Sequence, residues 1–454
     1  MEANFTCHET YIKFCLDIAK ESLSGYGTIK EIKQAQPEIN AYENIDAIDE
    51  PKNICLLDAD KLGEEDYKEA VETIMNGRYF AEHTCAGEAT RLGLGTKYLI
   101  DISRDLSLDM ISRLMGEEKE RYVSNETVVE QAGTRPEKLL PLSLGTRHML
   151  QYSFDIYNLA LKYGYDPEEV LKRQKMLVVL NEDTAERIIK EFMQNNFFGF
   201  KRKNIMFMIQ RSFHGINLND GEFFYDETTP KRLHNHGQMV MQQTLDEEIF
   251  YMDDKNKRVY MKSDEFGEVL KEMDDKISYN IEDLEYLTGS IDFDSLCFAL
   301  DKAKEGYGML MEIVANNPEN PQKGGMAAFD KKLNRNVMIE GFQLKGIKNH
   351  EITYLNKNFN HYPKPYQCWS MLKKHGLQMP IDVKSGYIYF QPVQGDINFL
   401  VKTEFFRRNE LKPIKAWKSP ATTPLAIQYM SLQDRQKGFE EYARKILSER
   451  AWSC

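Results

Sequence analysis

The chain has 454 residues, of which 42% are hydrophobic and 29% are charged, and its formal net charge at pH 7 is −12. These are ordinary values for a globular protein, and the length allows two or three domains or one large, elaborated α/β domain. The negative charge argues against a general affinity for nucleic acid or for anionic membranes, because such binding needs clustered Lys and Arg to neutralise phosphates.

The seven cysteines are dispersed, odd in number and form no C-x-x-C pair, which argues against a disulfide framework and against a zinc site. No apolar run approaches the roughly 18 residues that span a bilayer, and residues 1–4 lack the pattern of a signal peptide. We therefore expect a cytoplasmic protein that binds neither membrane nor nucleic acid.

Residues 1–77 are expected to form a helical N-terminal region. Apolar residues recur at helical spacing over 12–19 and 67–74, and Gly77 suits the end of the second helix. The Pro-containing segments 34–37 and 49–51 are expected to be loops.

The segment 84–97, TCAGEATRLGLGTK, combines small residues with Arg91 and Lys97. Small side chains let backbone N–H groups approach phosphates and a flat base, and the two cations add positive charge. The spacing of its glycines fits neither the dinucleotide-binding G-x-G-x-x-G pattern nor the P-loop. Taken alone, the segment favours a nucleotide-binding loop and a surface turn about equally.

A β-α-β unit is expected between residues 176 and 209. The apolar runs 176–180 and 205–209 are typical of buried strands, and a capping box at 183–186 opens a helix between them. An amphipathic helix is expected over 150–161, before the unit. The β-α-β unit itself predicts a parallel sheet. Further strands are predicted at 248–251, 258–262, 310–314, 336–340 and 387–390, and a final helix at 439–446.

Read in order, these segments resemble the UDP-glucose/UDP-N-acetylglucosamine pyrophosphorylase family. The family loop L-A-G-G-x-G-T-R-L-G, followed by P-K, is similar to residues 85–93, with Lys97 at the lysine position after a spacer one residue shorter. Three positions depart from this loop: Ala86 and Ala89 stand for glycines, and Thr96 for the proline.

The later family motifs occur in the same order, so the resemblance covers residues 80 to 415. The family segments M-T-S-D-D-T-H, N-x-Y-F-G, a strand ending in glutamine, G-H-G-D and N-x-D-N are similar to 180–186, 195–199, 207–210, 235–238 and 290–293. N-P-x-E-K-x-G, V-V-E-Y, F-N-T-N and F-x-P-V-K are similar to 317–325, 337–340, 355–358 and 411–415, with Gly341 in place of the tyrosine.

The resemblance implies an α/β fold, namely the three-layer, Rossmann-like nucleotidyltransferase fold of glycosyltransferase-A type, with a mixed sheet and a helical N-terminal layer. The expected divisions are a helical region at 1–77, a nucleotidyltransferase catalytic domain at 78–415 and a short helical segment at 416–454. The implied reaction joins UTP and a sugar 1-phosphate into a UDP-sugar and pyrophosphate, by Mg²⁺-assisted in-line attack on the α-phosphate. Glucose 1-phosphate is the preferred partner and N-acetylglucosamine 1-phosphate the next.

Cations and carboxylates are the implied catalytic groups. Arg91 would hold the β- and γ-phosphates, Lys97 the α-phosphate, and Lys415 would bridge the phosphates from the opposite wall. Asp292 matches the metal-binding aspartate of the family, and Asp294 is either a second Mg²⁺ ligand or a helix cap. Solvated surface charges are the alternative for Arg91 and Lys97.

The nucleoside would be held by Ala86 and Gly87 beside the base, by Gln210 at the uracil edge, and by His236 and Gly237 near the ribose. An exposed strand end and an ordinary loop histidine remain the alternatives for Gln210 and His236.

Sugar hydroxyls would be bound by Glu340 and by Asn356 or Asn358. The oligomeric state is not predicted. Because the loop glycines are altered, a second hypothesis is a catalytically inactive nucleotide-sugar sensor or assembly subunit on the same fold.

Overall fold

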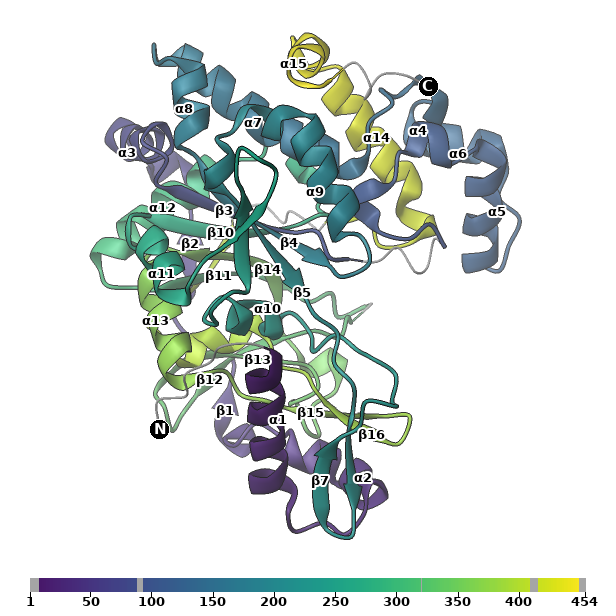
Figure 1. The fold of residues 1–454 in the computed structure, drawn as a ribbon, viewed down its shortest axis with the longest axis vertical. Coiled ribbons are helices and arrows are strands. Elements are labelled where there is room, and N and C mark those ends of the chain that lie inside the picture. The colour runs from purple at the N-terminus through teal and green to yellow at the C-terminus, as the bar shows by residue number, and fades with distance from the viewer. Residues whose placement is uncertain (1–7, 88–92, 320, 409–414, 449–454) are drawn as a thin grey trace.

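One large mixed sheet runs through the molecule (Figure 1). The structure is a computed structural model that describes residues 8–87, 93–319, 321–408 and 415–448. Within these residues the strand order is β2-β17-β11-β14-β10-β3-β4-β5-β8-β9. The bounds are β2 (Cys55–Leu57), β3 (Tyr79–Thr84), β4 (Lys175–Asn181), β5 (Ile205–Gln210), β8 (Ile249–Met252), β9 (Arg258–Tyr260), β10 (Asp275–Asn280), β11 (Met309–Ala315), β14 (Tyr354–Tyr362) and β17 (Thr403–Arg408). The predicted α/β class with a mixed sheet is confirmed.

The centre of this sheet is parallel. Strands β10, β3, β4 and β5 run in the same direction, so their last residues, Asn280, Thr84, Asn181 and Gln210, lie along one edge. The predicted β-α-β unit is confirmed as β4, α9 (Ala185–Gln194) and β5. Ligands of open α/β sheets bind outside the carboxyl ends of such strands.

Helices cover both faces of the sheet and make the three layers. On β3, Tyr79 and Ala81 pack into a core shared with α3, α7, α12, α14 and α15, whereas Phe80 faces a second core shared with α10, α11 and α13. This alternation is the period of two expected for a strand buried on both faces. The bounds are α3 (Glu64–Met75), α7 (Leu144–Lys162), α10 (Gly237–Gln242), α11 (Ser263–Lys271), α12 (Phe293–Lys304), α13 (Pro365–His375), α14 (Thr423–Asp434) and α15 (Phe439–Ile446).

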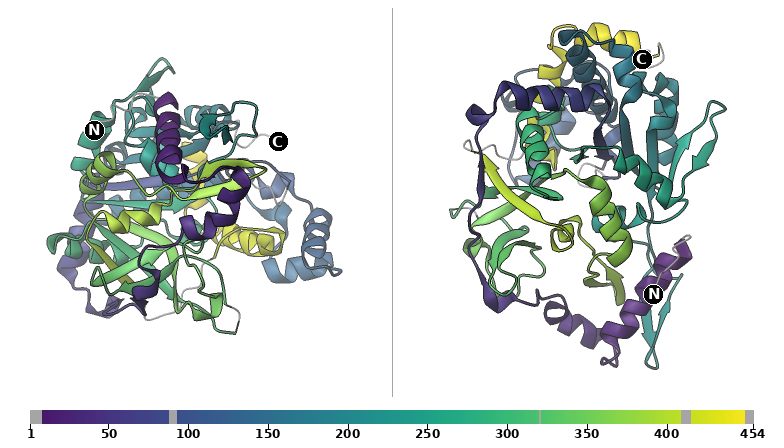
Figure 2. Two further views of the ribbon diagram at one scale, coloured as in Figure 1. Left: turned by 90° about the horizontal axis from the view of Figure 1, so that it is seen from below. Right: turned by 90° about the vertical axis from the view of Figure 1, so that its left-hand side faces the viewer.

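A small antiparallel sheet lies at the opposite end of the molecule from α14 and α15 (Figure 2). It consists of β15 (Ile381–Lys384), β16 (Tyr387–Phe390), β6 (Ile216–Asn219) and β7 (Glu222–Tyr225), and it packs against α1 (His8–Leu23) and α2 (Ile29–Ile39). The remaining elements are β1 (Ile48–Asp49), β12 (Met326–Asp330), β13 (Arg335–Ile339), α4 (Ile102–Asp105), α5 (Leu108–Glu118), α6 (Asn125–Ala132) and α8 (Pro167–Arg173).

The terminal segments join these cores rather than standing apart. Helices α1 and α2 cover the small sheet, α3 belongs to the main helical layer, and β2 extends the large sheet beside β17. At the other end of the chain, Trp417 and the buried residues of α14 and α15 share a core with β4. The boundaries expected near residues 77 and 415 therefore fall within continuous packing.

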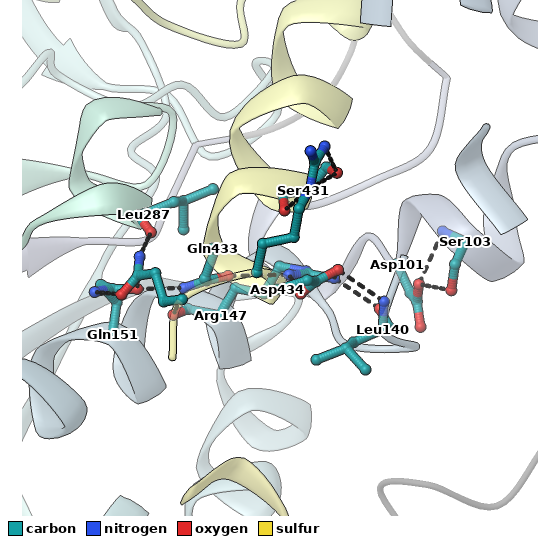
Figure 3. Close-up of polar contacts among 11 residues, drawn as sticks. Asp101, Ser103, Leu140, Arg147, Gln151, Leu287, Ser431, Gln433 and Asp434 are labelled. Atoms are coloured by element: carbon teal, nitrogen blue, oxygen red, sulfur yellow. Dashed lines mark hydrogen bonds and ion pairs between the residues drawn. The ribbon is translucent and has the colours of Figure 1, made fainter. Parts of the chain in front are cut away.

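A buried arginine fixes the C-terminal helices to the body (Figure 3). The guanidinium of Arg147 on α7 donates to both carboxylate oxygens of Asp434, at 2.6 and 3.2 Å, and to the carbonyl of Leu140 at 2.7 Å. Gln433 donates to the carbonyl of Arg147 and to Gln151, both at 3.0 Å. These contacts hold α14 against α7. None of the described helices combines the length and the apolar character needed to cross a membrane.

Because several histidines are buried, we expect the free energy of unfolding to fall as the pH is lowered. Burial lowers the pKa of His83 and His234 to about 3 and that of His236 to about 4, and burial, aided by nearby His83, lowers the pKa of His148 well below its usual value. The unfolded chain binds these protons near pH 6.5, so between about pH 6.5 and 4 it binds more protons than the folded chain. We expect each such histidine to lower the free energy of unfolding by about 1.4 kcal/mol per pH unit in this range. Urea denaturation from pH 8 to 4.5 measures it, and a constant free energy would contradict this expectation.

Candidate nucleotide site

A cavity of about 750 Å³ lies at the carboxyl ends of the parallel strands, and we call it the strand-end cavity. Its volume is within the range of small-molecule sites. Four of the predicted nucleoside-binding residues line it: Ala86, Gly87, Gln210 and His236. Its other walls include Thr84, Ser212, Asn235, Asn280, Ile281, Glu282, Lys231, Arg232, Asp382, Lys384 and Tyr389.

The loop after β3 is tied down at both of its described ends. The side chain of Asn181, at the end of β4, donates to the carbonyl of Ala86 at 3.2 Å, and the N–H of Lys97 donates to the carbonyl of Gly87 at 3.2 Å. At Gly87, a Cβ would have Ile281 as its nearest neighbour, at 3.9 Å, which is ordinary van der Waals contact, so a small side chain would also fit there. Arg91 lies outside the described residues.

Gln210 and His236 present polar groups to the cavity. Gln210 donates to the carbonyl of Asn235 at 3.1 Å. The Nδ1 atom of His236 accepts from the N–H of Gln394 at 3.0 Å. Because burial lowers the pKa of His236 to about 4, the ring is neutral near pH 7 and its proton lies on Nε2. His236 is therefore a fixed N–H donor.

Gly237 has a different place from the one predicted. Its N–H donates to the carbonyl of Pro392 at 2.9 Å, and a Cβ at this position would lie 2.3 Å from the Pro392 carbonyl carbon. It does not line the strand-end cavity. Only glycine allows this backbone contact, which brings residues 392–394 against His236.

Glu282 is a further candidate for the site, and the sequence pattern did not single it out. It follows β10 directly in the run Asn280-Ile281-Glu282-Asp283, lines the strand-end cavity and forms an ion pair with Lys97. The ammonium group of Lys418 lies 3.8 Å from the other carboxylate oxygen. The side chain of Lys97 is only 9% exposed. The predicted catalytic lysine is thus buried behind Glu282, the carboxylate that lines the cavity.

Asp292, Asp294 and Lys415 line a second cavity of about 640 Å³, which we call the Arg408 cavity. Among the described residues, Asn280 lines both cavities. The other walls of the Arg408 cavity include Tyr279, Asp283, Glu285, Tyr286, Ser290, Glu312, Lys357, Phe359, Arg408 and Tyr429.

The carboxylate of Asp292 is already engaged by protein groups. Arg408 donates to it at 2.5 Å and also pairs with Glu312 at 3.1 Å, while Asp292 caps α12 by accepting from the N–H of Ser295. Burial is the largest single influence on the pKa of Asp292 and raises it, but the charge of Arg408 and the hydrogen bonds from Arg408 and the Ser295 N–H together lower it below its usual value. Asp294 accepts from the hydroxyl of Tyr67 at 2.6 Å. The helix cap expected at Asp294 is therefore made by Asp292 instead, and Asp294 contacts Tyr67.

The predicted sugar-binding residues form a third group. Glu340 follows β13 and is partly buried, and a Cβ at Gly325 would lie 3.3 Å from its Oε1 atom. The N–H of Asn356 donates to the carbonyl of Gly325 at 2.9 Å, which brings this backbone beside Glu340. The side chain of Asn358 lies outside the described part of the chain. The structure thus separates the predicted metal ligands, in the Arg408 cavity, from the nucleoside residues.

Solved structures with this architecture exist, although no family model and no curated protein matches the sequence. The UDP-N-acetylglucosamine pyrophosphorylase of Trypanosoma brucei, solved with an inhibitor, matches with a TM-score of 0.59 at 11% identity, over 92% of this chain and 79% of that chain. The chain has the fold of the UDP-sugar pyrophosphorylases. A mutant UDP-glucose pyrophosphorylase of Leishmania major, solved with UDP-glucose, matches with a TM-score of 0.52 at 12% identity, over 93% and 79% of the two chains.

Glu282 and Asp292 are the two carboxylates to consider for a magnesium ion, and each is paired with a cation of the protein. In nucleotide sites Mg²⁺ is bound by one or two carboxylates together with phosphate oxygens. Glu282 offers one carboxylate to the strand-end cavity, beside two lysines that could pair with phosphates instead. The carboxylate of Asp292 is held by Arg408. Among the described residues, no group of three or more His, Cys, Asp and Glu side chains has the arrangement of a metal site, so phosphate oxygens would have to supply the remaining ligands.

Proposed function

We propose that this protein is a uridylyltransferase that forms a UDP-sugar and pyrophosphate from UTP and a sugar 1-phosphate. The observation that carries the proposal is the strand-end cavity, which Gly87, Gln210, His236 and Glu282 line on a UDP-sugar pyrophosphorylase fold, with Lys97 paired to Glu282. Glucose 1-phosphate is the preferred substrate and N-acetylglucosamine 1-phosphate the next. The free thiols of Cys15, Cys85 and Cys297 agree with a cytoplasmic location.

The chemistry needs positioning and charge neutralisation rather than a protein nucleophile. An oxygen of the sugar phosphate attacks the α-phosphorus of UTP in line, and pyrophosphate leaves. Gln210 would hold the uracil edge, since an amide both donates and accepts, and His236 would donate from Nε2 to ribose or phosphate. Lys97 would release Glu282 and pair with the α-phosphate as negative charge develops there. Mg²⁺ bound at Glu282 would neutralise phosphate charge.

A catalytically silent nucleotide-sugar sensor is the second candidate. It is favoured by the loop, where Ala86 and Ala89 replace glycines, and by the salt bridge that neutralises Lys97. Such a protein would bind a UDP-sugar without turnover.

Two measurements separate the candidates. We expect pyrophosphate release that requires UTP, Mg²⁺ and glucose 1-phosphate or N-acetylglucosamine 1-phosphate, and a calorimetric titration that detects UDP-glucose binding. Binding without pyrophosphate release from either sugar phosphate would establish the sensor. If the protein neither binds UDP-glucose nor releases pyrophosphate, both candidates are excluded.

A further inference from the structure

Arg232 is a partly buried arginine that lines the strand-end cavity and has no carboxylate partner in the described part of the chain. Its Nε atom is buried and forms no hydrogen bond with any described residue. By contrast, Arg78, Arg211 and Arg408 each pair with a carboxylate. A buried polar group without a partner calls for an explanation, and a ligand in the cavity would supply the missing acceptor.

The backbone of Arg232 is fixed against the segment that follows β5. Arg232 and Phe213 exchange two backbone hydrogen bonds, each of 2.8 Å. Phe213 lies three residues beyond Gln210, where β5 ends at the cavity. The position of Arg232 therefore follows from that of β5.

The side chain of Arg232 is held by an aromatic ring. Its guanidinium carbon lies 5.5 Å from the ring centroid of Tyr389 on β16, and Tyr389 also lines the cavity. The hydroxyl of Tyr389 donates to the carbonyl of Pro230 at 2.8 Å, which fixes the ring beside residues 231–232. A guanidinium that stacks on a ring keeps its N–H groups available for hydrogen bonds in its own plane. Arg232 is thus positioned in advance to donate to an acceptor in the cavity.

The cations of the strand-end cavity differ in whether a carboxylate neutralises them. Lys384 pairs with Asp382 at 2.7 Å, and the two lysines beside Glu282 share its charge. Lys231, which is exposed, and Arg232 are adjacent and both line the cavity. Within the described residues neither of these two forms a salt bridge. The uncompensated positive charge of the cavity therefore lies at residues 231–232, on the wall that Tyr389 of the small sheet supports.

A phosphate group is the ligand that these two cations would bind best. A guanidinium offers two parallel N–H donors to two phosphate oxygens, and an ammonium group adds charge without a fixed direction. The chain has a net charge of −12, so an anion gains little attraction from the rest of the molecule and depends on such a local cluster. A neutral base or sugar would leave both charges uncompensated.

We propose that Arg232, together with Lys231, forms a phosphate subsite of the strand-end cavity, which binds a substrate phosphate other than the α-phosphate of UTP. This inference rests on the proposed function, in which Lys97 pairs with the α-phosphate. Two substrates carry such a group, since UTP has its β- and γ-phosphates and the sugar 1-phosphate has its own. In either case the small-sheet side of the cavity helps to align the reactants for in-line attack.

Calorimetric titration of Arg232→Gln with UTP, UMP and glucose 1-phosphate, each alone, tests the proposal without requiring turnover. If the subsite holds the terminal phosphates of UTP, the affinity for UTP should fall at least about tenfold and that for UMP should stay within about threefold, because a hydrogen bond between charged groups is lost. If it holds the sugar phosphate, the affinity for glucose 1-phosphate should fall at least about tenfold and the affinities for both nucleotides should stay. N-acetylglucosamine 1-phosphate replaces glucose 1-phosphate if the wild-type protein binds only the former.

Arg202→Gln is the matched control. Arg202 also stacks on an aromatic ring, that of Phe197 at 5.0 Å, but it lies outside the strand-end cavity and donates to Asn256 and to the carbonyl of Asp253. Its affinities for all three ligands should equal those of the wild type. Arg232→Lys keeps the positive charge, so it should lose less affinity than Arg232→Gln, and it serves if that variant does not fold.

The outcomes distinguish the two proposals. Wild-type affinities of Arg232→Gln for UTP and the sugar phosphate, or an equal loss for UTP and UMP, overturn the phosphate subsite while the nucleotide site stands. A loss in Arg232→Lys or Arg202→Gln as large as that in Arg232→Gln also overturns it, because the charge at this position would then not matter. A wild-type protein that binds neither nucleotide overturns the proposed function and this inference together.

Discussion

Glu282→Gln is expected to lower the rate of pyrophosphate release at least about a hundredfold at saturating UTP and Mg²⁺. The substitution keeps the size of the side chain and removes the negative charge that lines the strand-end cavity beside Lys97. A charged group that acts mainly in the transition state contributes about 3 kcal/mol, which corresponds to this factor. A coupled pyrophosphate assay measures the rate, and higher Mg²⁺ should recover part of it if the carboxylate binds the metal.

Glu285→Gln is the matched control for this experiment. Glu285 lies three residues further along and lines the Arg408 cavity, so the same chemical change is made outside the strand-end cavity. Its activity should stay within about threefold of the wild type, as expected for a group outside the reacting centre. Comparison with Asp292→Asn then decides between the two possible metal ligands. If Glu282→Gln keeps full activity and Asp292→Asn loses about a hundredfold, Asp292 in the Arg408 cavity is the metal ligand.

Apolar strands could be predicted from the sequence, and polar ones could not. The runs that became β4 and β5 consist of large apolar residues, and the shorter predictions that match β8, β9, β11, β13 and β16 are also confirmed. Strands β3 and β10 carry Glu82 and Lys276, which no periodicity assigns to a sheet interior. In the structure these two side chains pair with each other at 2.8 Å, which allows both to be buried. Such a pair is visible only once the strands are adjacent.

The metal site predicted at Asp292 meets the same limit and stays a prediction. Ser290–Phe293 has aspartate at the third position of the pattern N-x-D-N, whereas Asn280–Asp283 has glutamate there. What favours the second segment is topology: it follows β10, a central parallel strand, while Ser290–Phe293 leads into α12. The sequence does not predict a strand at 275–280, because this segment contains charged residues, and without that strand the place of Glu282 at the sheet edge cannot be predicted. The position of Gln210 at the edge of the sheet could be predicted, because it ends an apolar strand.

Asp434→Ala is expected to lower the free energy of unfolding by about 3–5 kcal/mol, because it leaves the buried guanidinium of Arg147 without its counter-charge. The side chain of Arg147 is 1% exposed, so water cannot replace the lost carboxylate. The double variant Arg147→Met, Asp434→Leu should recover most of this loss, since an apolar pair of similar volume carries no buried charge. Urea denaturation of the single and double variants measures both effects. A loss below about 1 kcal/mol in Asp434→Ala would mean that the pair behaves as a solvated surface salt bridge and that α14 is held to α7 by apolar packing instead.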